Sequence, residues 1–502
     1  MALYLYHSLD RAFREICLDA ELLPLFKELW CKKGPPTAEL ISHYSSQPSV
    51  PSVPPPPPPP PDAEKAATLT ALADGFGRLL QNQHQGFLPN VRQQRAAGLA
   101  IVELAQAMHE QLAARRAGNT VWVSSAGSSV QAGASGRHQF GWRDLMDIVV
   151  KWRQVAEPND QVVWVDLLTR REFEAGFGSH TPMFTGQTKC VRYYMNFTRA
   201  MELHKNVLLR DGHAFDAQNR PLACGSAQQQ ESIRKATTSQ DMYAVIGNDS
   251  WVVVHINSVL RPGAMMEGTR LTLVKVPNQP DAFEFSIRTP VTPPRWKEFD
   301  AELEAAFEGI IAGMLADNKP RTARAILTYA YYWYNFMPLA RGTAACGYTT
   351  ILALFWAAGM PVTATIPRDT QVDWEAILQQ HPDAFVASVG AWLLPPAARE
   401  PPAAPAAAAA AGTTVTNGAA TSAPAAAAST TASNAAAKEP GGGGGGASAS
   451  GRSSSSSASA KGKAAPPPAV FPPVGAVPVV CEVLSTLRAR LEVLNGVGAR
   501  RL

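Results

Sequence analysis

The chain has few of the features that mark secreted, metal-binding or cofactor-binding proteins. Its 502 residues include six cysteines, which form no CxxC pair and no spacing typical of metal ligands. Sparse, unpatterned cysteines are typical of a reducing compartment. The N-terminal sequence MALYLYHSLDRAF carries early charge and lacks the apolar core of a secretory signal. We therefore expect a cytoplasmic protein, with the nucleus as the alternative, and predict no metal site and no cofactor.

Charge of one sign is not concentrated in any segment. The formal net charge is +4, the pI is near 8.7, and no block of five or more basic residues occurs. Nucleic-acid binding requires a clustered basic surface, so we predict no nucleic-acid partner. The apolar stretch Thr343 to Ile366 contains no charge over 24 residues. Its five Thr, two Gly and Pro361 favour a buried core helix over a membrane span.

Two stretches contain too few apolar residues to form a core. Arg399 to Pro478 is a low-complexity stretch, almost wholly Ala, Ser, Thr, Gly and Pro, and Pro54 to Pro61 is a run of eight prolines. The first predicts disorder and the second a polyproline linker. The predicted organisation is an N-terminal helical segment (1–44), a Pro-rich linker (45–63), a second helical segment (64–123), a main domain (137–395), a disordered tail (396–478) and a C-terminal helix (479–502).

Apolar residues in the main domain recur at strand or helix spacing. The sequences WVVVHI (251–256), TRLTLVKV (269–276) and FEFSIR (283–288) predict three strands, of which the first is apolar on both faces and hence central. A turn at 277–280 makes the last two a hairpin. Helices are expected at 141–154, 189–209, 321–335, 343–358, 373–379 and 385–394 and from Pro293, and a short strand at 162–166. These elements predict an α+β fold, a helix-rich domain with a small, mostly antiparallel sheet.

One loop in the main domain has the pattern of a nucleotide-binding motif. Residues 337–343, MPLARGT, resemble the loop HPFx[DE]GN of Fic-type nucleotidyl transferases, with Pro338, Leu339 and Gly342 matching its Pro, Phe and Gly. The resemblance implies a His that accepts a hydroxyl proton, but Met337 stands in its place and cannot accept a proton. We therefore expect no catalytic residue.

An anion site remains a hypothesis at this loop. Arg341 provides a cation, and the start of the next helix at Gly342 and Thr343 provides backbone N–H groups. The alternative is a structural loop in which Arg341 pairs with a carboxylate such as Glu298 or Asp300.

Three further patterns have both a functional and a structural interpretation. GFGSHTPMFTGQTK (176–189) is either a ligand-holding loop containing His180 or a tight turn before a helix. His213, between two Asp residues, suits a turn better than a metal site. The third is a set of arginines that line one anionic groove or form separate ion pairs: Arg270, Arg288, Arg295 and Arg341.

Long stretches of the chain carry a family resemblance. They are ALYLYHSLDRAF (2–13), FKELWCKK (26–33), GFLPNVRQQRAAGLA (86–100), WRDLMDIVVKWRQ (142–154), GFGSHTPMFTGQTKCVRYY (176–194), MEGTRLTLVKV (266–276), FSIRTPVTPPRWKEFDAE (285–302), YYWYNFMPLARGTA (331–344) and VDWEAIL (372–378). Together they resemble the C-terminal half of the tetratricopeptide-repeat proteins known in plants as suppressors of effector-triggered immunity, with tetratricopeptide repeat protein thirteen as the animal relative.

The resemblance implies a non-enzymatic intracellular regulator or scaffold. Such a protein would act through protein–protein contacts and restrain immune or stress signalling, a role in the defence response. Family members carry tandem repeats before the shared region, whereas this chain starts inside it, so we expect a repeat-less relative or a truncated gene product. The alternative function is a catalytically dead Fic-like module that binds a nucleotide or another anion.

Overall fold

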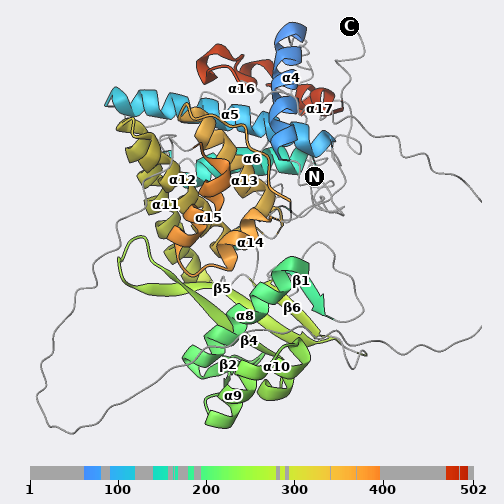
Figure 1. The fold of residues 1–502 in the computed structure, drawn as a ribbon. Coiled ribbons are helices and arrows are strands. Elements are labelled where there is room, and N and C mark those ends of the chain that lie inside the picture. Colours follow the sequence, from blue (N-terminus) through green and yellow to red (C-terminus); the bar gives the residue numbers. More distant parts are fainter. Residues whose placement is uncertain are drawn as a thin grey trace, which may run out of the picture. The chain divides into compact units, whose positions relative to one another are not determined.

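The computed structural model describes most of the main domain and parts of its flanks. The described residues are 62–80, 91–118, 140–156, 162, 164–167, 179–185, 194–276, 278, 283–288, 293–339, 341–368, 370–395, 471–485 and 487–495. The predicted segment 1–44, residues 45–61 of the predicted linker 45–63, and residues 396–470 of the predicted tail lie outside them. The predicted fold class is confirmed, because a helix-rich body is combined with one antiparallel sheet (Figure 1).

The sheet is built from antiparallel neighbours throughout. Its strands are β1 (Ser179–Thr185), β2 (His213–Phe215), β3 (Pro221–Ala223), β4 (Ser250–Asn257), β5 (Met265–Lys275) and β6 (Phe283–Arg288), in the order β1-β6-β5-β4-β2-β3. The three predicted strands are β4, β5 and β6, and the predicted hairpin is the β5–β6 pair, in register at Leu271 and Ile287. β4 lies inside the sheet, as its apolar character on both faces predicts.

One face of the sheet packs against three helices, α8 (Tyr194–Asp211), α9 (Ala227–Lys235) and α10 (Ser239–Ile246). Alternate strand residues such as Val252, Val254, Leu271 and Leu273 fill this smaller core. α9 and α10 each begin with a capping box, which supplies acceptors to first-turn N–H groups. α10 ends at Gly247, whose φ of 80° suits a residue without a side chain.

A second, larger core lies among the remaining helices. They are α4 (Ala63–Leu79), α5 (Val91–Arg116), α6 (Trp142–Ala156), α11 (Pro293–Leu315), α12 (Lys319–Phe336), α13 (Thr343–Ala357), α14 (Val372–Ile377) and α15 (Pro382–Leu393). α4 and α5 pack closely because Gly98 has no side chain: a Cβ atom there would lie 2.0 Å from the carbonyl oxygen of Ala73.

The described helices include none that is long and apolar enough to cross a membrane. The uncharged stretch predicted to be a core helix forms α13, which has 15 residues. At about 1.5 Å per residue this helix is roughly 22 Å long, less than the ~30 Å of a hydrocarbon layer. Ile351, Leu352 and Leu354 of α13 are buried in the larger core.

The chain returns to this core near its end. Residues 471–495, here called the C-terminal strap, contain a 3-10 turn η5 (Val474–Ala476) and the helices α16 (Val480–Val483) and α17 (Leu487–Asn495). Figure 1 shows α16 and α17 in red beside α4 and α5. Val474 and Val477, which we assigned to the tail, are buried in the core. The boundary at 478 therefore lies too late, because these valines pack with the strap.

Two other segments differ from the expectation. In the predicted strand 162–166 Trp164 forms a single β-bridge, with Leu339, and a 3-10 turn, η2 (Val165–Leu167), follows directly. The stretch 176–189, expected to be a loop or turn, contains strand β1, which pairs with β6. Pairing with a partner distant in sequence decided both cases, and local composition did not reveal it.

Candidate functional site

The predicted anion site lies at the corner between α12 and α13. α12 ends at Met337, which adopts a left-handed conformation with φ 47° and ψ 60°. Gly342, with φ 85°, precedes α13. Between them, Leu339 forms an isolated antiparallel bridge with Trp164. Two left-handed residues and one bridge therefore set the path of this corner.

The three predicted site residues differ in exposure. Arg341 is exposed, Gly342 is half-buried and Thr343 is buried. The Thr343 hydroxyl donates to the carbonyl oxygen of Leu339 at 3.3 Å, so it turns back into the loop. The carboxylates considered as partners of Arg341 make other contacts.

Glu298 and Asp300 lie on α11 and are engaged elsewhere. A Glu298 oxygen lies 2.8 Å from the guanidinium of Arg261. Asp300 accepts a hydrogen bond of 2.8 Å from the indole N–H of Trp142. Asp300 thus serves the packing of α6 against α11.

At this corner an anion would meet mainly backbone N–H groups and few polar side chains. Gly342 supplies no side-chain cap to α13, and the first-turn residues Ala344 and Ala345 are exposed. The first N–H groups of a helix have no intrahelical acceptor, so they are available to an anion or to water. Met337, at the position of the Fic histidine, is buried and packs in the smaller core with Trp374.

A cluster of three tryptophans lies under the corner. Trp142, Trp164 and Trp333 meet edge to face, with ring centroids 5.8–6.5 Å apart. Trp333 donates to the carbonyl oxygen of Thr343 at 2.9 Å, and Trp164 donates to Asp147 at 2.9 Å. Burial raises the pKa of the Asp147 carboxyl. Because each indole N–H has an acceptor, the cluster is a rigid support for the corner.

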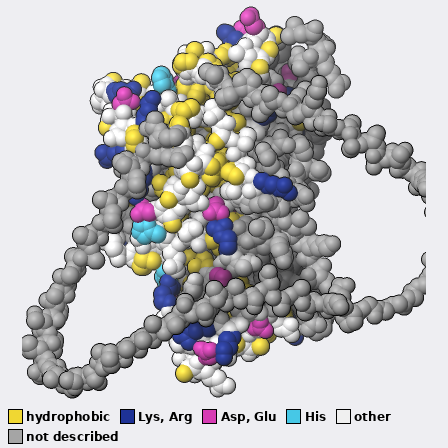
Figure 2. Space-filling view, in the orientation of Figure 1, with side chains coloured by type: hydrophobic (Ala, Val, Ile, Leu, Met, Phe, Trp, Pro, Cys, Tyr) yellow, Lys and Arg dark blue, Asp and Glu magenta, His cyan; other side chains and the backbone are white. Residues whose placement is uncertain are grey.

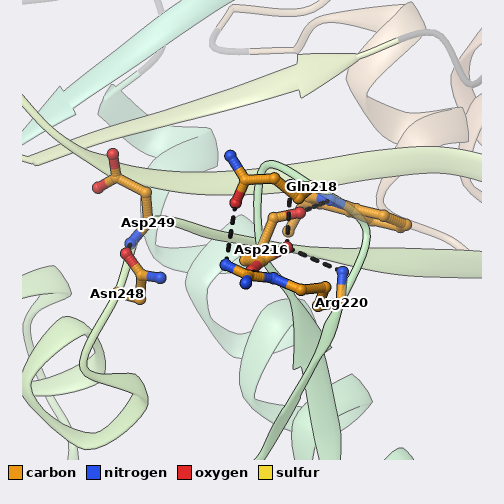
Figure 3. Close-up of polar contacts among 6 residues, drawn as sticks. Asp216, Gln218, Arg220, Asn248 and Asp249 are labelled. Carbon is orange, nitrogen blue, oxygen red and sulfur yellow. Dashed lines mark hydrogen bonds and ion pairs between the residues drawn. The ribbon is translucent and has the colours of Figure 1, made fainter.

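A second candidate site, which the sequence did not predict, lies at the β2–β3 turn (Figure 3). Asp216 is buried and accepts hydrogen bonds from the backbone N–H groups of Gln218 and Arg220 at 2.9 and 2.8 Å. The Arg220 side chain also donates to Asp216, at 2.7 Å. Burial alone raises the pKa of Asp216, but the N–H and the guanidinium of Arg220 hold it below its usual range. Trp251 of β4 donates to the Asp216 carbonyl oxygen at 2.9 Å.

An aromatic and arginine stack extends from this turn across three strands. The rings of Phe215 and Trp251 are stacked at 4.5 Å, and the guanidinium of Arg270 lies 3.9 Å from the Trp251 ring centroid. His213 meets Phe215 edge to face at 4.9 Å. Arg270 also pairs with Glu267 at 2.6 Å. The side chains of His213, Phe215, Trp251 and Arg270 are half-buried, and these four residues are here called the sheet-face stack.

The other predicted residues take structural positions. His213 lies in β2 rather than in a turn, and one ring nitrogen is 2.8 Å from the carbonyl oxygen of Asp211. His180 lies in β1. Within the described part of the chain, no group of three or more His, Cys, Asp or Glu side chains is placed to hold a metal ion. The second site was not predicted. The signal that could have indicated it is HAFDAQNRPLA (213–223), in which two short apolar runs flank a turn.

Comparison with known proteins agrees with the resemblance seen in the sequence. No protein-family profile matches the chain. Suppressor of RPS4-RLD 1 from Arabidopsis thaliana is 35% identical over 439 residues, which cover 79% of this chain and 42% of that protein. Tetratricopeptide repeat protein 13 from Homo sapiens is 29% identical over 409 residues, which cover 78% of this chain and 44% of that protein.

These similarities extend over most of the fold. The chain therefore belongs to the family of these two proteins, and the predicted resemblance is confirmed. The chain spans less than half the length of either relative.

Proposed function

We propose that this protein is a non-enzymatic regulator that acts inside the cell through contacts with other proteins. We further propose that it restrains immune or stress signalling. The observation that carries the proposal is the 35% identity with a protein named as a suppressor, over 79% of this chain. An intracellular location is favoured by Cys224, Cys346 and Cys481, which are thiols rather than disulfides.

The sheet-face stack is our candidate for the contact surface. It presents aromatic rings and a guanidinium that are half-buried in the isolated chain, and such residues carry much of the binding energy in protein interfaces. On the face shown in Figure 2, Lys and Arg side chains are spread among apolar and acidic ones. Because the basic side chains are not clustered, this surface suits a protein partner that covers the aromatic rings and one arginine better than it suits a polyanion.

Affinity capture with matched variants tests this surface. Phe215→Ala and Arg270→Ala together remove the two side chains that stack on Trp251. Arg234→Ala changes an exposed residue of α9 and is the control. We expect the full chain and the control to recover the same partners, and the double variant to lose them with its circular dichroism spectrum unchanged. Equal recovery by all three proteins would exclude the stack as the contact surface.

A second candidate function is anion or nucleotide binding at the α12–α13 corner. It is favoured by the lack of a side-chain cap at Gly342 and by the exposure of Arg341, Ala344 and Ala345. Because Met337 replaces the general base, the activity would be binding without transfer. Arg341, Gly342 and Thr343 are the proposed anion-binding residues.

Calorimetry on the full chain separates the two candidates. With ATP as the probe, an occupied corner should give heat that Arg341→Glu abolishes and Arg368→Glu, on a different exposed loop, does not. No heat at saturating ATP would end the nucleotide proposal and leave the contact surface untouched.

A further inference from the structure

The C-terminal strap is held against the helices by a small set of directional contacts. At its start, Phe471 stacks on Phe76 of α4, with ring centroids 3.8 Å apart and an interplanar angle of 8°. The indole N–H of Trp356, near the end of α13, donates to the carbonyl oxygen of Pro472 at 2.9 Å. Two aromatic side chains from different helices thus fix the point where the strap arrives.

Gln106 of α5 binds the extended part of the strap through its backbone. The amide nitrogen donates to the carbonyl oxygen of Pro478 at 2.9 Å, and the amide oxygen accepts from the N–H of Val480 at 3.0 Å. One side chain therefore satisfies a donor and an acceptor of the same extended segment. Gln106 is buried, so its polar atoms depend on the strap for hydrogen-bond partners.

Glu103, one turn before Gln106, anchors the helical part of the strap. It accepts from the indole N–H of Trp152 at 2.6 Å and lies 3.4 Å from the guanidinium of Arg490. Arg490 is 1% exposed, and its guanidinium lies 4.8 Å from the Trp152 ring centroid. The Cys481 thiol donates to the other Glu103 oxygen at 3.4 Å. Glu103 and Trp152 thus form a preorganised receptor for one arginine.

Arg95 of α5 binds the far end of the strap. It donates to the carbonyl oxygen of Val493, in the last turn of α17, at 3.0 Å. It is held in place by two hydrogen bonds of 2.8 and 2.9 Å to Asp74 of α4. A cation at the last turn of a helix satisfies a carbonyl that has no intrahelical donor.

The strap has the properties of a segment that orders on binding. Its helices have four and nine residues, shorter than the ~12 residues at which an isolated helix becomes stable. Its apolar residues, including Val480 and Leu484, are buried against the other helices. Residues 396–470 join it to α15, so the strap and its receptor helices belong to one chain but are separated by 75 residues of sequence.

We propose that the face made by α4, α5, Trp152 of α6 and the end of α13 is a peptide-binding groove, and that residues 471–495 are its detachable ligand within the same chain. The groove recognises an aromatic residue followed by Pro-Pro, an extended backbone, and a short helix whose Arg490 reaches Glu103. A second copy of the same segment can therefore replace the strap, and its release uncovers an apolar face for binding. The groove is independent of the sheet-face stack.

Cleavage within the tether tests whether the strap exchanges. A site-specific protease sequence replaces Gly441 to Gly446 in the full chain, and the chain is cut under native conditions. A labelled peptide of residues 468–502 is then added at increasing concentration. We expect the peptide to displace the strap and to remain bound on gel filtration, while the helical circular dichroism signal of the rest is retained. Release of the strap only in denaturant, together with loss of the whole helical signal, would overturn the proposal.

Variants of the peptide test the recognition without any change to the folded chain. Arg490→Ala in the peptide removes the partner of Glu103, and we expect its dissociation constant to rise at least about tenfold. Gly475→Ala is the matched control, because a Cβ atom there would meet no atom within 4 Å. Equal affinities of the three peptides would show that the groove does not recognise the arginine, and would contradict the proposal.

Discussion

The two apolar cores of this protein are assembled from the chain in different ways. The smaller core, under the sheet, draws most of its residues from one continuous stretch, 200–283. The larger core combines residues of 69–165, 299–394 and 474–494 with Ile256 and Met266 of the sheet, and the range 474–494 follows a long low-complexity segment. Contacts between distant parts of the chain require larger loops to close, at an entropic cost that local contacts avoid. The comparison shows that one chain contains a core built mostly from one stretch of sequence and a core that forms only when segments distant in the sequence meet.

Residues from each part of the chain pack in the core of the other. Ile256 of β4 and Met266 of β5 lie in the larger core, and three residues lie in the smaller core in the same way. Met337, Trp374 and Ile377 come from the helical part of the chain but pack in the smaller core with strand residues. If they couple the cores, the two should unfold together. Substitutions at the residues that connect the cores, within each core, and at two helix ends test this comparison.

The largest effect is expected at Trp374, which is 2% exposed. Trp374→Ala leaves a cavity between the cores and should lower the free energy of unfolding by about 4 kcal/mol. Urea unfolding followed by circular dichroism measures the loss. Trp392→Ala, at a half-buried residue of α15, should cost about 1 kcal/mol and is the control. If hydrogen exchange shows the strands opening before α12 and α13 in Trp374→Ala, the residue couples the cores; equal protection would refute this.

Gly347 of α13 tests the larger core alone. A Cβ atom there would lie 2.5 Å from Tyr334 and 2.7 Å from Trp333, so Gly347→Ala should lower the free energy of unfolding by about 3 kcal/mol. Gly309→Ala on α11, where a Cβ atom meets nothing within 4 Å, should instead stabilise the protein by ~0.5–1 kcal/mol. Chemical unfolding of both variants measures the two changes in the free energy of unfolding. A loss below 1 kcal/mol in Gly347→Ala would mean that α12 and α13 shift apart easily.

His204 makes the smaller core sensitive to acid. Burial lowers its pKa to about 3, against ~6.5 in the unfolded chain. Below pH 6.5 the unfolded state therefore binds a proton that the folded state does not, and stability falls as the pH falls. At pH 5 the loss from this residue is about 2 kcal/mol. The difference in unfolding free energy between the natural chain and His204→Leu should change by this amount between pH 7.5 and pH 5, and a constant difference would contradict the assignment.

The smallest effect is expected at a helix end. The Asn318 side chain accepts a hydrogen bond of 3.0 Å from the N–H of Arg321 and caps α12. Asn318→Ala should lower the free energy of unfolding by about 1 kcal/mol. Ser226→Ala, which removes the cap of α9 beside the smaller core, should cost a similar amount. Hydrogen exchange of the first turn of each helix measures the local change, and faster exchange far from the altered cap would argue against a local effect.

Sequence patterns predicted the elements that have a periodic or local signal. The apolar residues of 251–256 gave a central strand, and the turn at 277–280 placed β5 and β6 in one hairpin. In the larger core, the helix from Pro293 was expected because Pro is tolerated in the first turn. In each case the signal and the structure that it predicts lie within about 20 residues of each other, so a local pattern contains the needed information.

The candidate sites were predicted less well. The MPLARGT motif located the α12–α13 corner, but the bridge of Leu339 to Trp164 and the exposure of Arg341 depend on distant segments. The sheet-face stack was missed because β2 has three residues, too few for a periodic signal. The strap was predicted only as a helix at the end of the chain, and its contact with Glu103 joins residues almost 400 positions apart.

The sequence alone determined the fold class, the family, and the elements whose residues repeat at strand or helix spacing, because these depend on short stretches of side chains. Only the tertiary structure decided which residues meet at the corner, on the sheet face and under the strap. The reason is physical: such contacts exist only after distant segments have closed onto a common core, and their energies come from burial and directional hydrogen bonds that no single segment contains.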